Sequence, residues 1–141
     1  MNVEKENINS KVNRMAIICN HKNLAKCLID WLKLFYPEFD YREYDNYREI
    51  IPGLINYNPE FIILDTGLNP DNYIKLIKSI NKNLSNTELI VTSSFEEKTL
   101  IHSLKNENID FLIYKHNLKT ELIKIINSLL NNNKEDGILK N

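Results

Sequence analysis

Hydrophobic residues gather in five short runs whose patterns indicate β-strands. Four of the runs are almost continuously apolar and rich in β-branched residues, which is typical of strands covered on both faces of a sheet. They read MAIIC at 15–19, EFIIL at 60–64, ELIVT at 88–92 and DFLIY at 110–114. The remaining run, FDYREY at 39–44, alternates along its length. That alternation predicts an outer strand with an exposed face, and we expect only this strand to be half exposed.

Each run is followed by apolar residues at helical spacing. Asn23 is the expected N-cap of the first helix, and Pro52 is expected to kink or restart the second. The five stripes consist of Leu24, Cys27, Leu28, Trp31, Leu32 and Phe35; of Ile50, Ile51, Leu54 and Ile55; of Tyr73, Leu76, Ile77 and Ile80; of Leu100, Ile101 and Leu104; and of Leu118, Leu122, Ile123, Ile125, Ile126, Leu129 and Leu130.

Five strands that alternate with five helices predict an α/β fold with a parallel sheet and helices on both of its faces. Right-handed crossovers between short buried strands favour the doubly wound, flavodoxin-like strand order 2-1-3-4-5. The chain of 141 residues suits one domain. We expect a flexible arm over 1–13, which lacks apolar periodicity, the domain over 14–131, and a polar, frayed tail over 132–141.

Charge and composition exclude several classes of function. The net charge of -1 gives no electrostatic footprint for nucleic acid or for an anionic membrane surface. No apolar stretch approaches the length of a membrane span, and the polar start MNVEKENINSKVN lacks the apolar centre of a signal peptide. We therefore expect a cytoplasmic protein. Cys19 and Cys27 lie within apolar patterns and are interpreted as reduced core thiols.

Candidate chemistry lies where the strands end. In open α/β sheets, ligands bind beyond the carboxyl ends of the strands. Asp65, Thr92 and Lys115 stand at three such ends, so a carboxylate, a hydroxyl and an ammonium group are expected on one rim. The chain has only three glycines and no Gly-rich loop, which argues against a dinucleotide or P-loop nucleotide site.

The strand ends IILD, IVTSS and FLIYK resemble those of response-regulator receiver domains, the CheY-like modules of two-component signalling. The resemblance extends over 14–130. It implies that Asp65 accepts a phosphoryl group, that Thr92 contacts the phosphoryl oxygens, and that Lys115 pairs with both. It also implies a histidine kinase or another signalling protein as partner, without nucleic acid or membrane binding by this chain.

The sequence departs from the receiver pattern at the metal site. Receivers place two acidic residues after the first strand to hold Mg²⁺, whereas the matching positions here are Cys19 and Asn20. Asp65, the Gly67 carbonyl and the Asn20 amide would give the ion a single charged ligand, which is the minimum of the one or two carboxylates that usually hold Mg²⁺. We expect a weak Mg²⁺ site at most, no required cofactor, and an Asp65 carboxylate that is stable as an ion pair with Lys115.

The end of the last strand also differs from the receiver pattern. The proline that follows the lysine in receivers is His116, so the Lys115–His116 bond is expected to be trans. The position of the usual aromatic switch residue is Leu112.

Several alternatives stay open. The first is an atypical receiver, a non-enzymatic interaction module with weak or absent Mg²⁺-dependent phosphorylation. The second is an ordinary receiver phosphorylated on Asp65 by a histidine kinase, and the third is a small flavodoxin-like enzyme or cofactor carrier. Asp65, Thr92 and Lys115 also have plain interpretations as strand-end and loop residues. The dense apolar pattern of the last helix suits core packing, or a homodimer through the helix 4, strand 5 and helix 5 face.

Overall fold

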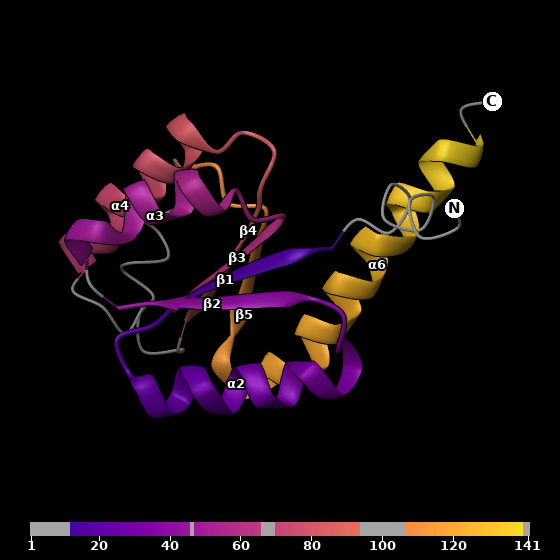
Figure 1. Cartoon of the computed structure of the whole chain (residues 1–141), viewed down its shortest axis with the longest axis horizontal. Helices are drawn as coiled ribbons and strands as arrows, with labels where there is room; N and C mark the ends of the chain where they lie inside the picture. Colours follow the sequence, from indigo (N-terminus) through magenta and orange to yellow (C-terminus); the bar gives the residue numbers. More distant parts are fainter. Residues whose placement is uncertain (1–11, 46, 66–69, 94–106, 140–141) are drawn as a thin grey trace, which may run out of the picture.

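A parallel sheet of five strands forms the centre of the fold. The computed structural model describes residues 12–45, 47–65, 70–93 and 107–139. The sheet order is β2-β1-β3-β4-β5, and every neighbouring pair is parallel (Figure 1). This confirms the flavodoxin-like order predicted from the sequence. The strands are β1 (Arg14–Ile18), β2 (Asp40–Tyr44), β3 (Phe61–Asp65), β4 (Glu88–Ser93) and β5 (Phe111–Tyr114).

Helices cover both faces of the sheet. Figure 1 shows α3 (Tyr47–Tyr57) and α4 (Pro70–Asn83) on one face, and α2 (Lys22–Phe35) and α6 (Leu118–Leu139) on the other. A short 3-10 turn, η2 (Lys115–Asn117), connects β5 to α6. The helix expected around Leu100, Ile101 and Leu104 lies outside the described residues. None of the described helices combines the length and the apolar character needed to cross a membrane.

Two apolar layers hold the helices to the sheet. Successive side chains of a strand point to opposite faces, so Ile18 and Leu64 pack with α3 and α4. Their neighbours Ile17 and Ile63 pack with α2 and α6. This division explains why the central strands are continuously apolar, since both of their faces are buried.

Both edges of the sheet are partly exposed. β2 is half exposed, as its alternating pattern predicts. β5 forms the opposite edge, and its Leu112 has an exposed fraction of 37%. The expectation that only the run at 39–44 is half exposed was therefore wrong. A continuous apolar run does not tell a central strand from an edge strand, because the exposure depends on the neighbours.

Two helix boundaries differ from the predicted ones, and of the two alternatives at Pro52, a kink or a restart, the restart is not seen. α2 begins at Lys22 with His21 as its N-cap and without a side-chain cap, so Asn23 lies inside the first turn. α3 continues through Pro52. The helix α6 extends to Leu139 and includes most of the predicted tail at 132–141. Adding a residue to an existing helix is much easier than starting one, so a polar sequence can prolong a helix that is packed at its beginning.

The helix α2 is rotated relative to the predicted stripe. Ala25 and Leu32 are its buried residues, whereas Leu24, Cys27 and Phe35 are exposed. The prediction of a buried Cys27 was therefore wrong. Apolar residues occupy most of the circumference of this helix, so their spacing did not determine which part faces the sheet.

Candidate functional site

A buried carboxylate stands at the carboxyl-terminal edge of the sheet. Asp65 is the last residue of β3 and only 6% exposed. The register of β3 and β4 sets it beside Thr92, which is also buried. Lys115 follows β5 directly and begins η2. The structure thus brings together the three side chains expected on one rim, while their chemical roles stay predictions.

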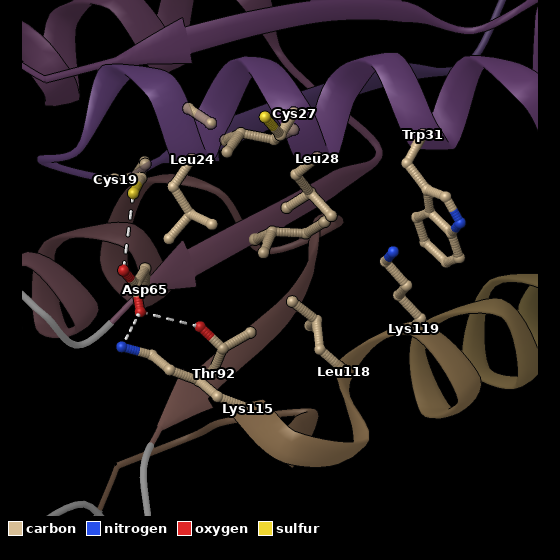
Figure 2. A pocket seen from close by; sticks show the side chains of 14 residues that line it. Cys19, Leu24, Cys27, Leu28, Trp31, Asp65, Thr92, Lys115, Leu118 and Lys119 are labelled. Carbon is tan, nitrogen blue, oxygen red and sulfur yellow. Dashed lines mark hydrogen bonds and ion pairs between the residues drawn. The ribbon is translucent and has the colours of Figure 1, made fainter.

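Two of these groups meet on the same oxygen of Asp65. The Lys115 Nζ lies 2.9 Å from Asp65 Oδ1, and the Thr92 hydroxyl donates a hydrogen bond of 3.2 Å to that oxygen (Figure 2). The lysine side chain is 37% exposed and the carboxylate side chain 8% exposed. A buried carboxylate needs such partners, because burial of an uncompensated charge is costly. Lys115 and Thr92 therefore compensate the buried carboxylate at the edge of the sheet.

The other oxygen of Asp65 faces a thiol. The Cys19 Sγ lies 3.5 Å from Asp65 Oδ2 and 3.5 Å from the carbonyl oxygen of His21, which are distances of weak thiol hydrogen bonds, and its single proton is donated to one of them at a time. The backbone N–H of His21 donates to the same sulfur at 3.4 Å. Cys19 follows β1, and the last residue of that strand, Ile18, is in register with Leu64 of β3. The residues that come next, Cys19 and Asp65, therefore lie side by side at the rim.

The Cys19 thiol is held in its neutral form. Burial raises the pKa of the thiol, and the nearby Asp65 carboxylate raises it further. The hydrogen bond from the His21 backbone lowers the pKa, but burial is the larger effect. A neutral thiol is a weak donor, so Asp65 Oδ2 is less firmly held than Oδ1.

The donor atoms around Asp65 do not fit Mg²⁺. This ion requires oxygen ligands, whereas the group in contact with Asp65 Oδ2 is a sulfur. Asn20 is exposed, and Gly67 lies outside the described residues. Within the described part of the chain, no cluster of three or more His, Cys, Asp or Glu side chains could hold a metal. Of the expected Mg²⁺ ligands, Asp65 is the only carboxylate that the described residues place here, and the roles of Asn20 and Gly67 stay predictions.

The end of β5 has its own geometry. The Lys115–His116 bond is trans, as predicted, and the turn η2 follows at once. The rings of Tyr114 and His116 stack with centroids 6.2 Å apart. Leu112 is the exposed residue of this strand, and Ile113 is its buried residue.

Sequence reasoning missed one contact of the site. Cys19 was interpreted as a core thiol, and it is buried as expected, but its sulfur also touches the carboxylate. The available signal was its place directly after the first strand, at the same rim as Asp65. Ser93 is a second polar residue buried at the end of β4.

Among the comparisons with known proteins, the one with solved structures finds the same fold. No family model matches the sequence, and no curated protein matches it. Solved structures that resemble it include the signal receiver domain assigned to a Luxo repressor protein from Vibrio parahaemolyticus, with a TM-score of 0.73 and 18% identity over 93% of this chain and 99% of that one.

Two further solved structures also resemble the chain in fold. A LuxR-family DNA-binding response regulator from Staphylococcus aureus matches with a TM-score of 0.68 and 21% identity, over 83% of this chain and 98% of that one. A structure of adenylate cyclase from Rhodopirellula baltica matches with a TM-score of 0.71 and 15% identity, over 93% of this chain and 100% of that one. The fold is therefore that of receiver domains.

Proposed function

We propose that the chain is an atypical receiver of the two-component type, a signalling module that depends little on Mg²⁺-assisted phosphorylation. The receiver fold supports the first part of the proposal. The contact of Asp65 with Thr92 and Lys115 at the carboxyl ends of the strands supports a retained acceptor pocket. In this role the chain acts by binding other proteins and is not an enzyme.

The observation that carries the atypical assignment is the contact between Cys19 Sγ and Asp65 Oδ2. A receiver needs oxygen ligands at this place to hold Mg²⁺, and a neutral thiol offers neither charge nor a hard donor atom. Lys115 instead supplies the positive charge beside Asp65. The pocket can thus persist without a metal, since the ion pair compensates the buried carboxylate.

An ordinary phosphoacceptor is the second candidate, and one observation favours it. Asp65 Oδ2 has only a weak contact, so its lone pairs remain open to attack phosphorus. A new O–P bond to Asp65 would form while the N–P bond of a phosphohistidine donor breaks, and the donor nitrogen would keep the electron pair. Lys115 and Thr92 would stabilise the charge of the transferred group.

Intact-mass measurements distinguish the two candidates. The purified protein is incubated with phosphoramidate, with and without Mg²⁺, and compared with Asp65→Asn and with the double variant Cys19→Asp/Asn20→Asp. We expect little or no phosphoryl adduct on the natural sequence, a Mg²⁺-dependent adduct on the double variant, and none on Asp65→Asn. Circular dichroism checks that each variant is folded.

Two outcomes would contradict the proposal. A rapid, Mg²⁺-dependent adduct on the natural sequence, lost in Asp65→Asn, would make the chain an ordinary receiver. A folded double variant without any adduct would show that the residues after β1 are not what limits phosphorylation.

The proposed partners follow from the same assignment. A histidine kinase or another signalling protein would bind near the rim that carries Asp65. A homodimer through the face that includes β5 and α6 is also proposed, and a cytoplasmic location suits both. Sedimentation analysis at increasing protein concentration tests the dimer, since a constant monomer mass would exclude it.

A further inference from the structure

A cavity of about 360 Å³ opens beside Asp65, on the face of the sheet covered by α2 and α6. Figure 2 shows Leu24 and Leu28 of α2 on one side of it and Leu118 of α6 on the other. Asp65 lies at one end, and Trp31 and Lys119 lie at the opposite end. The volume falls within the range of about 300–1,000 Å³ that is usual for small-molecule sites.

The rotation of α2 explains why this space is apolar and not filled. The small side chain of Ala25 faces the sheet, while Leu24, Cys27 and Trp31 turn to the rim of the cavity. The apolar stripe expected in the core thus lines an open space. Ten of the lining residues carry side chains without a formal charge or a hydroxyl or amide group, and they include Ile17, Ile63, Leu28 and Leu118.

One end of the cavity carries a neutralised ion pair, and the other end carries a lysine. At the inner end, Asp65 and Lys115 neutralise each other at 2.9 Å. At the outer end, the Nζ of Lys119 lies 5.6 Å from the centre of the Trp31 ring. Within the described part of the chain, no carboxylate forms an ion pair with Lys119. The charged lining residues are two lysines and one aspartate, which favours a ligand with one negative charge.

These observations also fix the orientation of the ligand. A carboxylate buried next to Asp65 would be repelled, and it would lose its hydration. At the outer end it meets the exposed Lys119 and water. We propose that the cavity binds a medium-chain aliphatic monocarboxylate, with its carboxylate at Lys119 and its chain running between Leu28 and Leu118 toward Cys19.

The size of the cavity sets the length of the chain. At about 30 Å³ for each water-sized group, the cavity holds roughly a dozen non-hydrogen atoms. Decanoate has this size and is a suitable probe. The proposal goes beyond the receiver assignment and does not require Asp65 to be phosphorylated, so the binding assay contains neither a phosphodonor nor Mg²⁺.

Trp31 provides a direct readout, because it is the only tryptophan of the chain and lines the cavity. Decanoate is titrated below its micelle concentration while Trp31 emission is followed, and the neutral 1-decanol serves as a matched probe. We expect a saturable change at a stoichiometry of one. Lys119→Gln should weaken decanoate binding about two- to fivefold, the effect of one exposed ion pair. Lys124→Gln, on the same helix but outside the cavity, should leave it unchanged.

A second measurement does not depend on fluorescence. Cys27 is exposed and lines the cavity, whereas Cys19 is buried. Bound decanoate should therefore slow the alkylation of Cys27 by N-ethylmaleimide, followed by mass. Absence of both a saturable emission change and Cys27 protection would overturn the site. Equal binding of 1-decanol and decanoate, unaltered by Lys119→Gln, would overturn the choice of an anionic ligand.

Discussion

At the scale of single residues, the two oxygens of Asp65 have unequal surroundings. Lys115 and Thr92 both contact Oδ1, at 2.9 and 3.2 Å, while Oδ2 meets the Cys19 sulfur at 3.5 Å. The charge of Asp65 is thus compensated from one side. This arrangement makes Lys115 the main electrostatic support of the carboxylate, and the Cys19 thiol a weak partner of Oδ2.

Replacing Lys115 by Met should destabilise the protein. The carboxylate of Asp65 would stay buried without its cation, and an unsatisfied buried polar group costs about 1–3 kcal/mol. Urea unfolding at neutral pH measures this loss, and Lys124→Met on α6 serves as the surface control. Asp65→Asn in the Lys115→Met background should recover part of the stability. A Lys115→Met variant as stable as the natural sequence would contradict the pair's structural role.

The sequence was informative about the polar residues of the rim but not about their contacts. Asp65, Thr92 and Lys115 could be predicted because each ends a recognisable apolar run, and parallel strands end at one edge. The contact of Cys19 with Asp65 depends on the register of β1 against β3. A cysteine within an apolar pattern gave no reason to expect a polar partner.

At the scale of elements, the strands were easier to predict than the helix faces. Short β-branched runs located the strands, and their alternation with helices predicted the sheet order. The apolar residues of α2 cover so much of its circumference that its orientation could not be predicted. Packing then selected Ala25 and Leu32 for the interior and left Leu24 and Cys27 outside. This choice creates the cavity beside Asp65.

The contact between α3 and β2 gives a prediction at this scale. Gly53 lies inside α3, where an alanine usually stabilises a helix by about 0.5–1 kcal/mol. A Cβ atom at this position would lie 2.8 Å from Cε1 of Tyr44, so the tyrosine ring must shift. We expect Gly53→Ala to lower the free energy of unfolding by about 1–2 kcal/mol, as overpacking does.

A double-mutant cycle isolates the cause of that loss. In the Tyr44→Ala background the clash is absent, so Gly53→Ala should regain its usual stabilising effect in urea unfolding. If Gly53→Ala stabilised the protein in both backgrounds, the close packing of Tyr44 against α3 would be wrong.

At the scale of the whole molecule, hydrogen bonds from tyrosine hydroxyls connect the β2 edge of the sheet to the neighbouring helices and loop. Tyr36 donates a 2.7 Å hydrogen bond to Asn127 of α6, and Tyr41 donates one of 2.8 Å to the Tyr36 carbonyl oxygen. Tyr57 of α3 donates a 2.6 Å hydrogen bond to Asp40 Oδ2 at the start of β2. Burial raises the pKa of all three tyrosines, and that of Tyr41 to about 12.

The raised pKa values predict a loss of stability at alkaline pH. In the unfolded chain tyrosines release their protons near pH 10.0, while the folded protein holds them to higher pH. The stabilisation is therefore complete below pH 10.0 and is lost as the pH rises through the folded pKa of Tyr41, about 12.

Urea unfolding followed as a function of pH checks this prediction. The unfolding midpoint should fall steadily above pH 10.0, and Tyr41→Phe should reduce the slope, since one fewer proton is released on unfolding. A slope that is the same in Tyr41→Phe would show that this tyrosine does not contribute.

The length of α6 is a property of the whole chain that its sequence pattern did not predict. Figure 1 shows the carboxyl-terminal part of this helix extending away from the sheet. The apolar periodicity stops at Leu130, whereas the helix continues to Leu139. Periodicity reports the part of a helix that packs against a core, so the sequence after Leu130 gave no signal that the helix continues.

The central claim is that the residues after β1 leave Asp65 without an effective Mg²⁺ site, and calorimetric Mg²⁺ titration tests it most directly. The natural sequence is compared with Cys19→Asp/Asn20→Asp, which introduces two carboxylates directly after β1. We predict no saturable binding by the natural sequence below millimolar Mg²⁺, and saturable binding by the double variant. Saturable binding by the natural sequence at micromolar Mg²⁺ would contradict the account.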